Sequence, residues 1–585
     1  MARELMSDMV FGQILCDPGY RVDFALGTTY SMDLETFISL PFSLGFLEEP
    51  DEMMKRSSSC IFTAMKVCAD NLAVFCNFSS MKIPSKDRKV FYALMEDSIF
   101  GINVGTRKRP VVNFHPKVWV IRETSHDGSS SRIKLIVMSR NLAYSNDLDI
   151  ACEMSGEIGE KYASQASQMK HQPLCDFIEY LAGRISPVNR SQKDKRKKMR
   201  ALCDDILRVK SFDMSGSIYD DYDFLPMGIP GYDGSQELDF ISSRHEALVV
   251  SPFLDEKTML AFKKVKNPQN RFLVTREESV TEPMLEVFPK ENIFMMNPGM
   301  TDMGGEDPAC VNLHAKTYFV TDRGVACYHY LGSTNASTNG FFNNIEFMVR
   351  LRLAPYRYSF NSFREAFLDE KFTRFLGIVP PSSDRNEEYL LTEKIRRYMS
   401  MLRDGSVTLR DGDLYDMVIT ASGEDASVTV SPLLCPEQKV PLAREMRFGS
   451  IPLGSLSQFV VMTIEGEPQL VKVQMEMPEG RDQAICRRIM GPADFMDCVS
   501  FLLADNKEAY MMHKQLQDAR LSSGSGSGRN MLPALYEDLL RSVYERPAVL
   551  DDIRKLMESV PDSIMDPEFT EVFESLVKSI RIARR

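Results

Sequence analysis

The feature of this sequence that most constrains its fold is a short motif that occurs twice. The first copy reads Val-Asn-Phe-His-Pro-Lys and ends at Lys117, and the second reads Val-Asn-Leu-His-Ala-Lys and ends at Lys316. An apolar run, a Ser-x-Asn triplet and an acidic residue follow each copy. The two sets are His115, Lys117, Ser139, Asn141 and Asp149, and His314, Lys316, Ser333, Asn335 and Glu346. Because every further matching element lowers the probability of chance, the pattern indicates an internal duplication.

The spacing within each copy predicts a pair of antiparallel strands. Residues 118–121 and 317–320 have the apolar character of buried strands that lead away from the histidine, and residues 133–138 and 325–331 predict the returning strands. The interval from the lysine to the serine is five residues longer in the first copy (Lys117 to Ser139) than in the second (Lys316 to Ser333). The first copy contains a polar stretch typical of a hairpin turn. Since residues i and i+2 of a strand point to one face, the histidine and lysine of each copy should project together, beside the returning serine and asparagine.

This set of side chains suits phosphoryl chemistry. An imidazole can attack phosphorus, an ammonium group can neutralise non-bridging oxygens, and serine and asparagine can donate hydrogen bonds to them. A carboxylate can hold the imidazole in one tautomer through its second nitrogen. Displacing one ester oxygen while protonating another needs a nucleophile and an acid on opposite sides of the phosphorus. Two copies of the motif, brought face to face, supply both.

The paired H-x-K, S-x-N and acidic motifs resemble those of the phospholipase D superfamily, over roughly residues 1–380. The resemblance implies two similar α/β halves about a pseudo-twofold axis, with a metal-independent site between them and a covalent phosphohistidine intermediate. It also implies the roles of the residues. His115 and His314 would be nucleophile and general acid, with His115 favoured as the nucleophile. Phosphate would be held by Lys117, Lys316, Asn141 and Asn335, and the supporting residues would be Ser139, Ser333, Asp149 and Glu346.

The sequence departs from the family pattern at an aspartate that normally follows each lysine. Arg122 and Thr321 stand at the corresponding positions, and Asp322 is displaced by one residue. Ser139 also follows a methionine where the family usually has glycine. The missing aspartates make the chain more similar to the nuclease and DNA-phosphodiesterase branches than to the lipid-cleaving phospholipases.

Four further segments have a functional and a structural interpretation. The triplet Arg107, Lys108 and Arg109 precedes the first motif, which suggests substrate contact, although such triplets are usually solvated loops. The basic run 190–200 fits a solvated helix or linker as well as a nucleic-acid tether. Gly27-Thr28-Thr29 is predicted to be a turn and helix cap, since no G-K-[ST] follows it. Residues 215–234 are predicted to form a polar loop that lines the cleft or merely connects two elements.

The alternation of strands and helices predicts an α/β fold. Changes in the residue pattern further along the chain indicate additional domains. We expect a first half, a basic helical connector, a second half, a β-rich accessory domain with flanking helices, a Gly/Ser linker and a helical C-terminal module. Their predicted limits are 1–185, 186–211, 212–380, 381–520, 521–530 and 531–585. The C-terminal parts are expected to dock to protein, and self-association through them is one option.

Composition narrows the cellular setting. The 585-residue chain is 44% hydrophobic and contains no apolar run long enough to cross a bilayer. Its start lacks the basic-then-apolar order of a secretion signal, so we expect a cytoplasmic protein. The 12 cysteines are scattered without a C-x-x-C pair, which indicates buried thiols in a reducing compartment. The net charge of −12 disfavours indiscriminate coating of nucleic acid, but it is compatible with a local basic lining.

The leading hypothesis is a metal-independent phosphodiesterase that cleaves DNA or RNA, without a cofactor or metal. We expect it to tolerate chelators and to have two histidines of opposite protonation at its working pH. A phospholipase, a tyrosyl-DNA phosphodiesterase-like end-processing enzyme and a non-catalytic interaction subunit remain as alternatives. By analogy alone, the chain would serve bacterial DNA processing or phage defence. A helicase or ATPase partner would then be a separate polypeptide, because no Walker-type sequence is present.

Overall fold

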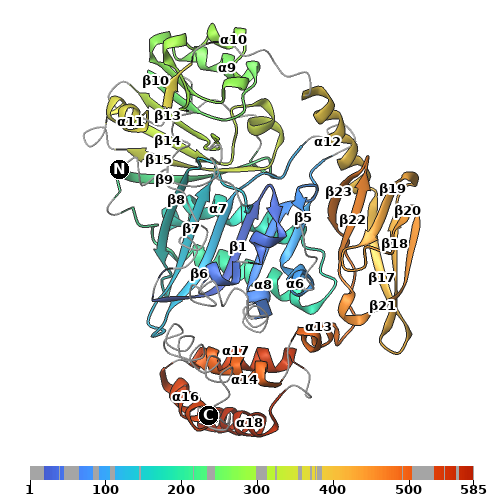
Figure 1. The fold of residues 1–585 in the computed structure, drawn as a ribbon. Coiled ribbons are helices and arrows are strands. Elements are labelled where there is room, and N and C mark those ends of the chain that lie inside the picture. Colours follow the sequence, from blue (N-terminus) through green and yellow to red (C-terminus); the bar gives the residue numbers. More distant parts are fainter. Residues whose placement is uncertain are drawn as a thin grey trace, which may run out of the picture.

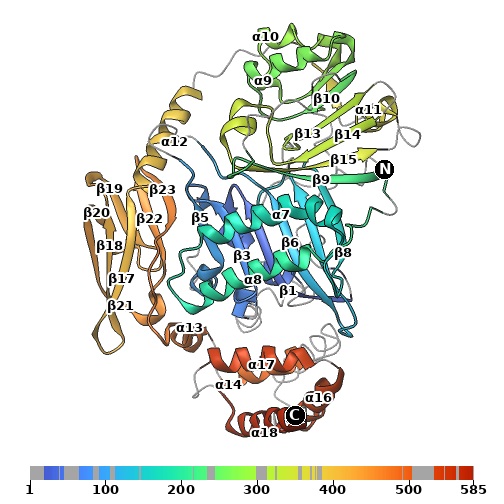
Figure 2. The same ribbon diagram turned by 180° about the vertical axis from the view of Figure 1, so that it is seen from behind.

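Two α/β halves, a β-rich part and a group of C-terminal helices make up the computed structural model (Figures 1 and 2). The residues that the structure describes are 17, 19–38, 40–44, 65–66, 68–83, 91–105, 112–143, 147–214, 217–232, 241, 244–297, 312–322, 326–353, 359–368, 372–375, 377, 385–489, 492–503, 532–545, 547–560 and 565–583. The predicted Gly/Ser linker at 521–530 and the basic triplet Arg107, Lys108 and Arg109 lie outside them.

The first half is built on a six-stranded sheet in the order β5-β3-β1-β6-β7-β8. Its strands are β1 (Tyr20–Thr29), β3 (Leu72–Asn77), β5 (Ile99–Ile102), β6 (Val118–Ser125), β7 (Ser131–Met138) and β8 (Ala151–Glu157). The strands β1, β3 and β5 are parallel, whereas β6, β7 and β8 form an antiparallel meander beside β1. The turn between β6 and β7 confirms the predicted hairpin at 125–130.

The second half has an eight-stranded sheet in the order β16-β12-β11-β10-β13-β14-β15-β9. Its strands are β9 (Tyr219–Met227), β10 (Glu246–Val250), β11 (Arg271–Val274), β12 (Ile293–Met296), β13 (Thr317–Asp322), β14 (Ala326–Gly332), β15 (Glu346–Leu353) and β16 (Phe372–Arg374). From β12 to β15 the order and the strand directions repeat those of the first sheet from β5 to β8. The two copies of the motif therefore occupy matching places, before β6 and before β13.

The helices α7 (Gln165–Arg184) and α8 (Arg190–Ile206) cover one face of the first sheet (Figure 2). Leu174 and Phe177 of α7 and Leu202 of α8 belong to a single apolar core with side chains of both sheets. The basic run 190–200 thus lies on a packed helix, in which Lys195 is buried and Lys198 donates to Asn71 Oδ1 at 2.8 Å. The burial of Lys195 follows from helical spacing, because Lys195 lies on the same face of α8 as the buried Met199 and Leu202.

Two predictions for local structure are wrong. Residues 215–234 were expected to be a loop, but β9 occupies most of the described part and pairs antiparallel with β15 along its length. From Tyr222 onward its side chains alternate between buried and partly exposed, as in a strand with one buried face. The acidic residues among them made the segment resemble a polar loop. Gly27-Thr28-Thr29 is the end of β1 and not a turn, and Asp33 caps the following helix, α3 (Leu34–Phe37). A Cβ atom on Gly27 would lie 2.7 Å from the Trp119 ring, so packing explains this glycine.

The β-rich part contains the sheets β17-β18-β21 and β20-β19-β22-β23. Their strands are β17 (Leu402–Asp411), β18 (Leu414–Ala421), β19 (Asp425–Pro432), β20 (Val440–Leu442), β21 (Glu445–Pro452), β22 (Phe459–Ile464) and β23 (Glu467–Lys472). Helix α12 (Arg385–Met399) leads into it from the second half (Figure 1). The helices α13 (Arg481–Ile489), α14 (Pro492–Leu503), α16 (Leu532–Glu545), α17 (Pro547–Ser559) and α18 (Pro567–Ala583) follow.

These C-terminal parts pack directly on the first half. Phe459 of β22 and Phe495 of α14 share an apolar core with Trp119 and other side chains on the second face of the first sheet. The buried Glu96 carboxylate accepts hydrogen bonds from Ser457 Oγ and Gln458 N, both at 2.9 Å, and pairs with the Arg481 guanidinium. The two parts therefore share an apolar core and a desolvated ion pair.

Within the described residues, no helix is long and apolar enough to span a bilayer. The eight cysteines whose side chains the structure describes are buried and form no disulfide with one another: Cys68, Cys76, Cys152, Cys175, Cys203, Cys327, Cys435 and Cys486.

Candidate active site

The two halves meet through short backbone contacts at the motif residues. Phe114, which precedes His115, forms a parallel bridge with Ile345, which precedes Glu346. In the reciprocal contact, Leu148 and Leu313 form a parallel bridge, and they precede Asp149 and His314. The hydrogen bonds from His115 N to Ile345 O and from His314 N to Leu148 O are both 2.9 Å long. Each histidine is thereby placed beside the carboxylate of the opposite half.

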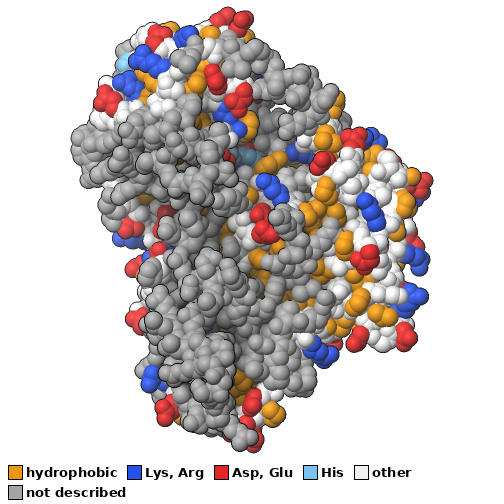
Figure 3. Space-filling model, viewed as in Figure 1, with side chains coloured by type: hydrophobic (Ala, Val, Ile, Leu, Met, Phe, Trp, Pro, Cys, Tyr) orange, Lys and Arg blue, Asp and Glu red, His pale blue; other side chains and the backbone are white. Residues whose placement is uncertain are grey.

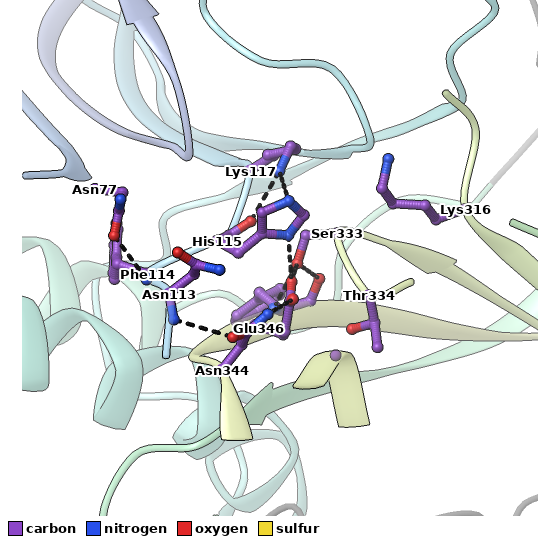
Figure 4. Close-up of polar contacts among 12 residues, drawn as sticks. Asn77, Asn113, Phe114, His115, Lys117, Lys316, Ser333, Thr334, Asn344 and Glu346 are labelled. Atoms are coloured by element: carbon purple, nitrogen blue, oxygen red, sulfur yellow. Dashed lines mark hydrogen bonds and ion pairs between the residues drawn. The ribbon is translucent and has the colours of Figure 1, made fainter. Parts of the chain in front are cut away.

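The side chains follow the same crossed arrangement. His115 Nδ1 lies 2.9 Å from Glu346 Oε2, and His314 Nδ1 lies 2.7 Å from Asp149 Oδ1 (Figure 4 shows the first pair). Because an ionised carboxylate only accepts, both imidazoles carry a proton on Nδ1 and direct the lone pair of Nε2 away from the carboxylate. Neither half alone contains a complete histidine–carboxylate pair.

Serine residues hold the two carboxylates in place. Ser139 Oγ donates to Asp149 Oδ1 at 2.6 Å, and Ser333 Oγ donates to Glu346 Oε2. Both carboxylates are buried, and Asn344 Nδ2 donates to the second oxygen of Glu346 at 3.1 Å. The S-x-N serines therefore lie against the carboxylates. Their expected roles, as supporting residues and as donors to phosphate, stay predictions.

Two lysines place positive charge beside the histidines. Lys117 Nζ lies 3.1 Å from His115 Nε2 and 3.0 Å from His115 O, and Lys316 Nζ donates to His314 O at 2.6 Å. Figure 4 shows both lysines on the same side of the Glu346–Ser333 cluster. Burial lowers the pKa of Lys117 well below its usual value, and the charge of Lys316 adds to the shift. Burial also lowers the pKa of Lys316, to about 8. An anion bound between them would relieve this repulsion.

Burial leaves both imidazoles uncharged at neutral pH. Burial lowers the pKa of His115 to about 4, and it lowers the pKa of His314 to about 4 as well, although each partner carboxylate opposes the shift. The Lys316 charge acts on His115 and the Lys117 charge on His314, so the two halves share one electrostatic environment. The expected opposite protonation is therefore not a property of the free site. The negative charge of a bound phosphodiester is what would favour a proton on one imidazole.

The other predicted site residues have a less defined place. Asn141 accepts from Ser31 N at 3.5 Å, and no described contact links its amide to a histidine. The buried amide oxygen of Asn335 has no hydrogen-bond partner among the described residues. Their predicted role in holding phosphate stays a prediction, as does substrate contact by Arg107, Lys108 and Arg109. In the described ranges, no group of three or more His, Cys, Asp or Glu side chains is arranged to hold a metal ion.

Sequence reasoning gave no role to several residues that the structure brings to the site. Asn113 and Asn344 join the two halves, with Asn113 N donating to Asn344 Oδ1 at 3.0 Å. Asn113 stands in the first motif and recurs as Asn312 in the second, which was the available signal for it, whereas the residue that corresponds to Asn344 in the first half is Asp147. The Tyr30 ring lies 5.0 Å from the His115 ring, centroid to centroid, and Arg396 reaches Asn113 from outside both halves. No pattern in the sequence indicated Tyr30 or Arg396.

Comparison with known proteins gives only distant similarity. No family model matches the chain, and no curated protein does. Among solved structures, yeast tyrosyl-DNA phosphodiesterase is similar at 9% identity and a TM-score of 0.35, covering 60% of this chain and 87% of that one. Phosphatidylserine synthase of Haemophilus influenzae is similar at 9% identity and a TM-score of 0.36, covering 67% and 90%. NucT from Helicobacter pylori is similar at 17% identity and a TM-score of 0.21, covering 26% of this chain and 100% of that one. At these values the similarity carries no argument about activity, which has to come from the site itself.

Proposed function

We propose that this chain is a phosphodiesterase of the phospholipase D type that cleaves nucleic acid through a phosphohistidine intermediate without a metal ion. The observation that carries the proposal is the crossed pairing of His115 with Glu346 and of His314 with Asp149. Two imidazoles, each fixed in the same tautomer by a buried carboxylate, supply the two groups that this displacement needs. We further propose that the two halves are related by a pseudo-twofold axis through this site.

In the proposed first step, His115 Nε2 attacks the phosphorus and forms a P–N bond. The bond from phosphorus to the leaving oxygen breaks, and that oxygen takes a proton from His314 Nε2. In the second step, His314 accepts a proton from water, the resulting hydroxide oxygen attacks phosphorus, and the P–N bond breaks to restore His115. Lys117 and Lys316 would stabilise the charge on the non-bridging oxygens in both steps.

The contact between Lys117 and His115 sets a condition for this cycle. Lys117 Nζ occupies the lone pair of His115 Nε2, so a substrate oxygen has to draw the amine away before attack. The anionic substrate also has to raise the pKa of His314, because burial leaves this imidazole uncharged. Substrate binding and activation of the two histidines are thus coupled through charge.

The test is hydrolysis by the purified chain in excess EDTA. The substrates are bis-p-nitrophenyl phosphate and labelled single- and double-stranded DNA and RNA. His115→Ala and His314→Ala should each lower cleavage to a small residual rate, whereas His126→Ala, at the exposed β6–β7 turn, serves as the matched control. His314→Asn should let the phosphohistidine adduct accumulate, visible by intact mass at neutral pH, because no base remains to activate water.

Adding phosphatidylcholine vesicles and DNA with end adducts to these substrates separates the other functions. Cleavage of phosphatidylcholine vesicles but not of DNA or RNA would assign a phospholipase, and loss of adducts only from DNA ends would assign end processing. Full cellular function in both histidine-to-alanine variants would assign an interaction subunit. Placement in a DNA-processing or phage-defence system with a separate motor is proposed by analogy, and co-purification from the native cell tests it.

A further inference from the structure

The helix that joins the second half to the β-rich part reaches the candidate active site with one arginine. Arg396 of α12 donates from Nη2 to Asn113 Oδ1 at 2.7 Å and to the Tyr30 hydroxyl at 3.4 Å. Tyr30 lies beside the His115 ring. Arg396 is 8% exposed, and among the described residues its Nη1 has no partner and its guanidinium forms no ion pair. A buried guanidinium without a counter-charge is costly, so an anion is the natural ligand for it.

The surface beside Arg396 is a groove of about 750 Å³. Arg396, Arg397 and Arg403 line it together with two aromatic rings, Phe78 and Tyr398, and the one carboxylate in the described lining is Glu393. Arg397 and Arg403 are exposed, and neither forms an ion pair within the described residues. The space-filling view shows a hollow between the second half and the β-rich part in which basic and histidine side chains are visible (Figure 3).

The lining has the composition of a single-strand binding surface. Proteins that hold unpaired nucleic acid combine a positive groove that follows the backbone with aromatic rings on which bases stack. The Tyr398 hydroxyl bonds to Asp425, which restrains its ring. The volume is within the range of pockets for small ligands, which suits individual unpaired nucleotides rather than a base-paired helix. The protein is acidic overall, with a net charge of −12, so this basic lining is a local feature.

We propose that this groove binds single-stranded nucleic acid on one side of the scissile phosphate, with Arg396 holding the adjacent phosphate. The inference rests on the proposed function and deepens it, because the β-rich part and α12 then complete the substrate site of the two α/β halves. Arg397 and Arg403 contact the following phosphates, and Phe78 and Tyr398 take the bases.

Binding is measured by fluorescence anisotropy with a labelled single-stranded oligonucleotide, in the His115→Ala background to prevent cleavage. The double variant Arg397→Ala/Arg403→Ala is compared with Arg410→Ala/Arg447→Ala, which removes equal charge from exposed positions of β17 and β21. Each lost phosphate contact lowers the slope of log K against log salt by about 0.7, so the groove variant should lose about 1.4. We expect its affinity at low salt to fall at least tenfold, and the control to stay within twofold.

Catalysis gives the second readout. On an oligonucleotide, kcat/KM should fall from wild type to Arg396→Lys to Arg396→Gln, because lysine keeps the charge and loses the planar fork. The thermal midpoint of each variant is measured alongside, and a rate loss at an unchanged midpoint supports a binding role. Bis-p-nitrophenyl phosphate is too small to reach the groove, so its hydrolysis reports on the reaction centre itself.

The outcomes are distinguishable. If the wild type hydrolyses neither substrate, the proposed function fails. If it hydrolyses both and the groove variant binds the oligonucleotide as the control does, the inference about the groove alone is overturned. Equal affinity of the wild type for single strands and for a hairpin duplex, or loss of anionic-vesicle binding without loss of oligonucleotide binding, would also overturn it.

Discussion

Replacing Glu346 with glutamine tests the crossed pairing directly. Glu346 Oε2 accepts from His115 Nδ1 and from Ser333 Oγ, while Oε1 accepts from Asn344 Nδ2. Glutamine has one oxygen and one NH2 group, so it cannot satisfy both sides. With its oxygen toward His115, its NH2 faces the Asn344 NH2, and a buried donor left unpaired costs about 1–3 kcal/mol. With its NH2 toward His115, the imidazole is driven to the other tautomer and loses the Nε2 lone pair.

Either outcome reduces the population of the reactive tautomer. Enforcing the wrong tautomer in a serine protease triad lowers kcat by about 10⁴, and general acid–base contributions are typically about 10²–10⁴. We therefore expect Glu346→Gln to lower kcat by about 10²–10⁴, which corresponds to about 3–5 kcal/mol in the activation barrier. KM should change little, because the carboxylate is buried behind the imidazole and does not contact substrate.

The assay is release of p-nitrophenol from bis-p-nitrophenyl phosphate by the full chain, with Glu157→Gln, an exposed carboxylate on β8, as control. Because Glu346 acts through His115, adding Glu346→Gln to His115→Ala should lower the rate no further. Adding it to His314→Ala should lower the rate further, since the variants affect different histidines. A Glu346→Gln enzyme within threefold of wild type, or a full additive loss on His115→Ala, would refute the crossed pairing as a functional device.

Three further predictions concern stability. Because burial lowers the folded-state pKa of His115 and His314 to about 4, below the unfolded value of about 6.5, the unfolded chain binds more protons in that range. Stability should therefore fall as the pH is lowered from 6.5 to 4, by about 3 kcal/mol for each imidazole, and thermal melts of the wild type and of His115→Gln/His314→Gln across this range check it. Arg481→Met leaves Glu96 buried without its counter-charge and should destabilise the docked C-terminal parts by about 3–5 kcal/mol, seen by melting and limited proteolysis. Adding Glu96→Gln should recover part of that loss, and Arg487→Met, exposed on the same helix, should have little effect. Gly27→Ala should lower the free energy of unfolding by about 1–3 kcal/mol, because the added methyl group would contact the Trp119 ring. The same substitution should cost less when it is made in a Trp119→Leu chain, since the ring is then absent.

The sequence by itself determined which residues form the candidate site. The repeated H-x-K and S-x-N motifs gave both histidines, both lysines, both serines and, by position, Asp149 and Glu346. Their spacing around two apolar runs also predicted the hairpins, because strand periodicity and turn composition are local properties that a single sequence records. The repeat in the sequence corresponds to the repeated strand order of the two sheets.

Only the tertiary structure decided which carboxylate serves which histidine. The pairing crosses between the halves through the Phe114–Ile345 and Leu148–Leu313 bridges, and contacts between segments so distant in the chain leave no local pattern. For the same reason β9, Gly27 and Arg396 were missed, since each depends on a partner supplied by another part of the fold: β15, Trp119 and Asn113. Burial likewise set the pKa of both imidazoles, and burial is a property of the assembled fold and not of any single segment.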